Sequence, residues 1–287
     1  MKNLHILATI SVLASALFFA GCDKIEKPYL QTTNSVSSDS LVFADTLPQA
    51  KGVLLEDYTG HTCGNCPGAA DIAAGLKTTY GEQVVIVAVH AGGFAKPKGT
   101  LLSYDFRTPA GDEWDTFFGI SAVSNPNGMI DRDGYPTTHV KSKSAWAGAV
   151  ANESALAVQA NLFFATKYDA STRVLTIGTM TKTLAALTST YKLVVVITED
   201  SIVQPQLDYR FTPDTITNYI HHHALRSAAS PAMGDEITLA PIGGSVIKAY
   251  NVTLGNDWVA EHCSVAAFLY DATTYKVVQA AEKKILP

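Results

Sequence analysis

"LLEDYTGHTCGNCP", residues 54–67, contains two cysteines separated by two residues, with a proline directly behind the second. An apolar run precedes Cys63, and residues 67–81 have the composition of a helix that ends at a glycine. The pair therefore lies between a predicted strand and a predicted helix N-terminus, which is the context of a redox dithiol. A helix N-terminus stabilises a thiolate. We therefore expect Cys63, the more exposed cysteine, to be the nucleophile. Cys66, expected one turn inside the helix, would resolve the mixed disulfide.

Three other chemistries of the cysteine pair compete with the redox dithiol. C-type haem attachment requires a histidine after the second cysteine, and Pro67 stands there instead. A structural zinc usually needs a second Cys/His pair. A second Cys pair is missing, although His61, His90 and the histidines at 221–223 could contribute in a suitable fold. A structural disulfide of this size would close a very short loop and constrain the unfolded chain little. The redox dithiol is favoured, and the other two remain open.

The stretch 54–67 resembles the strand–CxxC–helix pattern of the thioredoxin superfamily. This family keeps a buried acid six residues before the first cysteine, and Asp57 occupies that position. The resemblance implies that Asp57 assists deprotonation of Cys66, with the adjacent Glu56 as the alternative inward-facing acid. The aromatic residue that the family places before the first cysteine is Thr62 here, which leaves the redox potential unpredictable.

The same resemblance implies a cis-proline that faces the dithiol. Pro126, in "SAVSNPNGMIDRDG", is the candidate, and Pro136 beyond the following turn is the weaker one. A cis Asn125–Pro126 bond would expose backbone groups with which a substrate chain can pair. Asn125 and His61 are then candidates for a substrate groove, and residues at about 91–119 are expected to form an insertion beside the site.

The N-terminal 21 residues have the features of a lipoprotein signal peptide. A short positive start and an apolar run are followed by small residues before Cys22. Lipid on Cys22 would anchor an otherwise soluble protein, with residues 22–48 as a flexible polar tether. We therefore predict an exported bacterial lipoprotein of the outer membrane, on its periplasmic or cell-surface side, although an ordinary signal peptide remains the alternative. The net charge of −5 argues against nucleic acid as a partner.

The mature chain has two halves of different pattern. Residues 49–156 alternate strand-like and helix-like runs, including a predicted helix over 142–160. Residues 157–287 contain β-rich runs separated by turn signals, interrupted by a long excursion at about 204–236. We predict an α/β thioredoxin-like domain followed by a mostly antiparallel β-sandwich domain.

Three consecutive histidines lie inside the excursion. In an extended segment His221 and His223 would share one face and could hold a metal or respond to pH. The preferred interpretation is a surface or inter-domain loop in which these histidines and Arg226 bond to backbone carbonyls. No metal site and no cofactor other than the lipid are predicted. Cys263, in an apolar run, is predicted to be a buried, unreactive thiol.

A further resemblance covers nearly the whole mature chain. The small residues before Cys22, "EDYTGHTCGNCP", "YIHHHALR" and the terminal "YKVVQAAEKK" are together similar to the outer-membrane-protein-28-related lipoproteins. The resemblance implies a thioredoxin-like domain joined to a C-terminal β-rich domain. It also marks "YIHHHALR" as a family signature, which suggests docking between the two domains.

Two functions remain in competition. In the first, the protein performs thiol–disulfide exchange on envelope proteins or binds them in a redox-sensitive way. Cys63 then attacks, Cys66 resolves, Asp57 assists and Pro126 shapes the groove. In the second, the protein is a non-enzymatic surface binding protein or adhesin whose Cys63–Cys66 pair is a structural disulfide. In both, the partners are the membrane, through the lipid, and proteins or peptides of the envelope.

Overall fold

The computed structural model describes residues 41–44 and 46–286. The predicted signal peptide, Cys22 and most of the predicted tether lie outside the described residues, which belong to one compact unit. Within the described part of the chain, no helix is long and apolar enough to cross a membrane. Strands dominate and helices are few, which confirms the β-rich part of the predicted fold.

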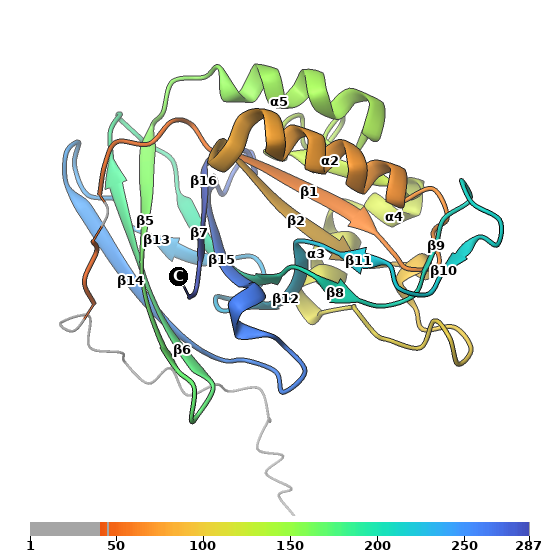
Figure 1. The fold of residues 1–287 in the computed structure, drawn as a ribbon. Coiled ribbons are helices and arrows are strands. Elements are labelled where there is room, and N and C mark those ends of the chain that lie inside the picture. Colours follow the sequence, from red (N-terminus) through yellow and green to blue (C-terminus); the bar gives the residue numbers. More distant parts are fainter. Residues whose placement is uncertain (1–40, 45, 287) are drawn as a thin grey trace, which may run out of the picture. The chain divides into compact units, whose positions relative to one another are not determined.

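A nine-stranded sheet forms the centre of the protein (Figure 1). Its strands are β1 (Val53–Thr59), β2 (Val84–His90), β3 (Asn127–Ile130), β4 (Lys141–Ser142), β7 (Tyr191–Glu199), β12 (Ala224–Ala228), β13 (Asp235–Ile237), β15 (Cys263–Asp271) and β16 (Val277–Lys284). Their order is β16-β15-β7-β12-β2-β1-β3-β4, and β13 pairs with β7. Strand β2 runs parallel to β1 and to β12. The other pairs are antiparallel.

The remaining elements surround this sheet. The other strands are β5 (Ala160–Asp169), β6 (Val174–Thr183), β8 (Ile202–Val203), β9 (Gln206–Leu207), β10 (Thr215–Ile216), β11 (Ile220–His221) and β14 (Ser245–Thr253). The α-helices are α2 (Pro67–Tyr80), α3 (Pro109–Phe118), α4 (Ile120–Val123) and α5 (Trp146–Ser154). The 3-10 turns are η3 (Gly81–Gln83), η4 (Gly93–Ala95), η5 (Lys143–Ala145) and η6 (Ala260–His262). The antiparallel sheet β5–β6–β14 packs against β7 and β15 through a shared apolar core.

Strand β1 contributes side chains to two separate cores, because successive residues of a strand point to opposite faces. Leu54 and Tyr58 pack in the core that includes α3, whereas Leu55 packs with α2 and α5. Since both faces are covered, β1 is buried along nearly its whole length. The same alternation directs Glu56 toward the α3 side and Asp57 toward the α2 side. Of these two acids, Asp57 is therefore the one that faces the helix after the cysteines.

Glu56 forms a buried ion pair with Arg132, which lies in the turn after β3. The Arg132 Nε and Nη2 atoms donate to the two carboxylate oxygens at 2.9 and 2.8 Å, and both side chains are 0% exposed. Four aromatic rings surround the guanidinium, with its carbon 4.6–5.5 Å from their centroids: Trp114, Phe118, Phe268 and Tyr270. The charge is therefore balanced by one carboxylate and by the faces of aromatic rings.

Strand β12 connects the two halves of the chain. It lies between β2 of the first half and β7 of the second, so that Ala224 is aligned with both Ala88 and Glu199. The Ala88 N–H also donates to the His223 carbonyl at 2.8 Å. The predicted division into domains at residues 156 and 157 stays a prediction, but strands from both sides of it share one sheet.

One local prediction needs correction. The helix expected over 142–160 is shorter, since α5 ends at Ser154. The Gln159 carbonyl instead accepts hydrogen bonds from the N–H groups of Leu184 and Ala185, just after β6. The segment 91–119, which is predicted to be an insertion, contains η4 and the core helix α3.

Candidate functional site

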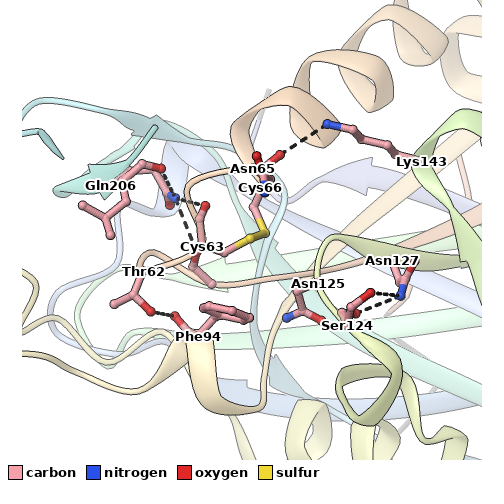
Figure 2. Close-up of a disulfide and its surroundings, with 12 residues drawn as sticks. Thr62, Cys63, Asn65, Cys66, Phe94, Ser124, Asn125, Asn127, Lys143 and Gln206 are labelled. Atoms are coloured by element: carbon pink, nitrogen blue, oxygen red, sulfur yellow. Dashed lines mark hydrogen bonds between the residues drawn. A yellow bond between two sulfur atoms is a disulfide. The ribbon is translucent and has the colours of Figure 1, made fainter. Parts of the chain in front are cut away.

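The two cysteines form a disulfide at the junction of β1 and α2 (Figure 2). Their Cα atoms are 5.4 Å apart, and Cys66 is the N-cap residue of α2 rather than a residue one turn inside it. Cys63 is 3% exposed and Cys66 1% exposed. Cys63 is thus slightly more exposed than Cys66, but both cysteines are buried in the described state.

Hydrogen bonds on several sides fix the loop that carries the disulfide. The Cys63 N–H donates to the Gly60 carbonyl at 2.9 Å, and the Cys66 N–H donates to the Cys63 carbonyl at 3.1 Å. Thr62 donates through both its N–H and its hydroxyl to the carbonyl of Phe94 in η4. The segment predicted to be an insertion thus fixes the loop through two hydrogen bonds to Thr62.

Asp57 lies on the same side of the sheet as α2 and is almost fully buried. Its Oδ1 atom has no hydrogen-bond partner among the described residues. Burial raises the pKa of Asp57 to about 7, and the positive charge of Lys143 opposes this rise. Lys143 also donates to the Asn65 carbonyl between the cysteines, at 3.5 Å. The acid is thus able to gain or lose a proton near neutral pH.

Asp57 and Cys66 line the same pocket, which has a volume of about 560 Å³. Its apolar wall consists mainly of small residues on α2 and of β2 residues. The pocket also contains His90, whose two ring nitrogens have no hydrogen-bond partner among the described residues. The pocket connects Cys66, on the interior side of the disulfide, to solvent.

The Asn125–Pro126 bond is cis, and so are Tyr135–Pro136 and Thr212–Pro213. Pro126 directly precedes β3, whose Asn127 is aligned with Tyr58 of β1. The pairing therefore places Pro126 beside the end of β1 that leads to the disulfide. The Asn125 amide nitrogen has no hydrogen-bond partner among the described residues, and Figure 2 shows this side chain across from the disulfide.

His61 does not line a surface groove. It is 1% exposed, and its Nε2 atom donates to the Leu102 carbonyl at 3.1 Å. The rings of His61, His90 and His221 surround Phe106, with centroids 6.0, 4.3 and 4.5 Å from its own. Burial lowers the pKa of all three histidines, that of His221 to about 4. Sequence reasoning missed this cluster, since Phe106 lies far from each histidine in the chain.

The three consecutive histidines have different environments. His221 is buried in β11, and its Nε2 atom donates to the Gln204 carbonyl at 3.2 Å. His222 is exposed, and the backbone leaves the extended conformation at His223, where φ is +53°. The expected shared face of His221 and His223 is therefore absent. In the described ranges, no group of three or more His, Cys, Asp or Glu residues is arranged to hold a metal ion.

Arg226 lies on β12 in a polar cluster that the sequence did not reveal. Its guanidinium donates to the Tyr104 hydroxyl at 2.6 Å and to Asp257 at 2.8 Å, and its Nε atom lies 3.1 Å from a Glu199 carboxylate oxygen. It also lies over the ring of Trp258, at a distance of 4.9 Å between the guanidinium carbon and the ring centroid. The predicted bonds of Arg226 to backbone carbonyls are thus replaced by contacts with side chains from both halves.

Acidification is expected to destabilise the protein through His221. Because its folded-state pKa is lowered from 6.5 to about 4, the unfolded chain binds more protons between these values. Stability therefore falls as the pH falls through this window, by about 2 kcal/mol from this residue between pH 7 and 4.5. Chemical denaturation at several pH values should show a smaller loss for His221→Phe than for the parent. The exposed His222→Ala serves as the control, and an unchanged loss in His221→Phe contradicts the assignment.

These features define a class: a β-rich protein with a buried CxxC disulfide at a strand–helix junction. The chain belongs to the outer membrane protein Omp28 family, whose model matches residues 112–287. The predicted family and the predicted outer-membrane location are thereby confirmed. The match begins after the cysteine pair, and lipid on Cys22 stays a prediction.

Solved structures provide a further comparison. HBP35 of Porphyromonas gingivalis aligns with a TM-score of 0.62 and 18% identity, over 84% of this chain and 77% of its own. A domain of the outer membrane lipoprotein Omp28 from the same organism aligns with a TM-score of 0.32 and 21% identity, over 45% of this chain and 88% of its own. No curated protein sequence matches the chain. The first of these likenesses bears on the fold alone.

Proposed function

We propose that this protein is a thioredoxin-like thiol–disulfide exchange protein of the outer membrane, anchored through lipid on Cys22. The arrangement of β1, the CxxC loop and α2 supports this, together with parallel β2 and with β3, which follows Pro126. The partner class is a polypeptide of the envelope that carries a disulfide or a pair of thiols. A nucleic acid is not proposed as a partner.

The observation that carries the proposal is the state of Asp57. A buried carboxyl with an oxygen that has no hydrogen-bond partner among the described residues is costly, and a purely structural disulfide has no need of one. This carboxyl instead shares a pocket with Cys66, and its pKa of about 7 suits proton transfer at neutral pH. Asp57 therefore has the position and the acidity of a general acid–base for the second cysteine.

The exchange proceeds in two balanced steps. The Cys63 thiolate attacks one sulfur of the partner's disulfide, so that a mixed disulfide forms and the other partner sulfur leaves as a thiolate. Cys66 then loses its proton to Asp57 and attacks the Cys63 sulfur, which releases the second partner thiolate. Two electrons pass from the Cys63–Cys66 dithiol to the partner, and the reverse sequence oxidises a partner dithiol.

Cys66→Ser is expected to trap a mixed disulfide on Cys63, because the resolving thiol is missing. Mixing this variant with a peptide that contains one disulfide should give a covalent adduct, seen by non-reducing mass spectrometry. Cys63→Ser should give at least tenfold less adduct, since Cys66 is the more buried cysteine. Both variants are made with Cys263→Ala, although burial already raises the pKa of that thiol to about 12. Equal trapping by the two variants contradicts the assigned roles.

A second function has one observation in its favour. Both cysteines are buried, as expected of a structural disulfide in a binding protein or adhesin. The reduction potential of the pair separates the two functions. A value between about −120 and −270 mV supports exchange, whereas a value below about −300 mV supports a structural disulfide and contradicts the proposed function.

A further inference from the structure

Residues 202–221, here called the arm, form a long double-stranded excursion next to the disulfide. Strands β8 and β11 pair at its base, and β9 and β10 pair farther out, with the tip at 208–214. The arm lies on the side of the CxxC loop opposite to η4, and Figure 2 shows its Gln206 side chain directed at this loop. The CxxC loop is thus held between two segments that come from distant parts of the chain.

The arm pairs with the CxxC loop through its backbone. The Leu207 N–H donates to the His61 carbonyl at 2.9 Å, and the Tyr209 N–H donates to the Gly64 carbonyl at 3.0 Å. The Gln206 side-chain amide donates to the Cys63 carbonyl at 3.1 Å. The two backbone donors are alternate residues of the arm, as in an added strand, whereas their acceptors are three residues apart in the turn that carries the cysteines. The arm therefore supplies backbone N–H groups of the kind that an extended polypeptide also carries.

Side chains of the arm complete the cover over the loop. A Cβ atom on Gly64 would lie 2.3 Å from the Tyr209 ring, so this ring lies directly against the glycine backbone. Arg210 bridges to Asp71 of α2 at 2.5 Å, across the start of the helix. Cys63 is nearly inaccessible as a result, although it belongs to an external loop.

We infer that the arm occupies the surface on which an extended polypeptide partner pairs, and that it must lift before another sulfur atom can reach Cys63. The identity of the partner rests on the proposed function, whereas the covering of the disulfide does not. The partner would replace the Leu207 and Tyr209 N–H groups with two of its own, at alternate residues. The arm thereby acts as an internal substitute for the substrate.

The construction of the arm permits such a movement. Its outer side is exposed, with Tyr209 at 60% and Phe211 at 55% exposure, so little apolar surface holds the tip down. The Arg210–Asp71 pair is about half exposed and is screened by solvent. The contacts of the tip are exposed, whereas Gln206 and Asp208 are buried, so lifting of the arm must release these two side chains. Such local opening requires less free energy than unfolding of the whole protein.

The test is the rate at which tris(2-carboxyethyl)phosphine reduces the Cys63–Cys66 disulfide. The double variant Tyr209→Ala/Arg210→Ala, which removes the ring over Gly64 and the tie to α2, should be reduced about tenfold faster than the parent. Phe211→Ala is the matched control, because its ring lies on the same tip and makes none of the contacts with the CxxC loop described above. Equal rates in variants with unchanged near-ultraviolet circular dichroism would overturn the inference.

Hydrogen exchange tests the arm without any substitution. The amides of Leu207 and Tyr209 should exchange at least tenfold faster than the Val87 amide in β2, because arm opening does not require unfolding of the sheet. Protection equal to that of Val87 shows that the arm does not open separately, which is incompatible with the inference.

A third measurement separates this inference from the proposed function. A peptide with one disulfide is offered to the reduced parent and to the reduced double variant. Faster exchange in the variant supports both ideas. Exchange at an unchanged rate supports the proposed function but rejects the arm as an occupant of the partner's place. Faster phosphine reduction without any peptide exchange supports the inference that the arm covers the disulfide, but it rejects the proposed function.

Discussion

Arg132→Met is expected to lower the free energy of unfolding by about 3–5 kcal/mol. The substitution leaves the Glu56 carboxylate fully buried and without its bidentate partner. It also removes the cation that the surrounding rings of Trp114 and Phe268 contact. Urea denaturation at neutral pH measures the loss, with the midpoint shifting at an unchanged slope.

Two companion variants show whether the buried pair is the cause. Glu56→Met/Arg132→Met removes both charges, and it should recover most of the loss because an apolar pair fits among the aromatic rings. Arg107→Met breaks an exposed pair with Asp105 and should cost less than about 1 kcal/mol. If the double variant is as unstable as Arg132→Met, the loss arises from packing and not from the unpaired carboxylate.

Asp57→Asn is expected to stabilise the disulfide form, by roughly 2–4 kcal/mol at pH 8. The folded-state pKa of this carboxyl is raised to about 7 by burial, above its unfolded value of 3.8. The unfolded chain therefore binds fewer protons between pH 4 and 7, and Asp57 lowers stability as the pH rises through this window. Asparagine removes the ionisation, so the gain should be larger at pH 8 than at pH 5.

Denaturation of the oxidised parent and variant at both pH values measures this difference. Glu261→Gln, at an exposed site on η6, is the control for removing one negative charge from the protein. A variant that is less stable than the parent at pH 8 would mean that Lys143 or a bound group compensates the charge of Asp57. The same variant should slow the second exchange step, which provides an independent measure of the role of Asp57.

Local signals explain what could be predicted from the sequence. An apolar run, a proline behind the second cysteine and a glycine after Tyr80 determine β1 and α2 from neighbouring residues alone. The disulfide, the parallel pair β1–β2 and the turn after β3 lie within reach of the same reasoning. The position of Cys66 was misjudged by one turn, since the end of a helix depends on backbone angles that composition does not specify.

Contacts between distant segments explain what could not be predicted. Whether Glu56 or Asp57 faces the dithiol depends on which side of β1 the helix α3 covers, and no local pattern states this. The Tyr209 ring that lies against Gly64, between the cysteines, belongs to the second half of the chain. The cluster around Phe106 likewise combines residues from four separate segments.

The place of β12 has a consequence for how the chain can be divided. A fragment that ends near residue 156 would retain β2 without its neighbour β12. The backbone N–H and C=O groups along that edge of β2 would then be unpaired. A fragment that begins at residue 112 would leave β12 exposed in the same way. Open edges of this kind pair with other chains, so both fragments are prone to aggregate. The first half and the last third of this polypeptide protect each other from self-association.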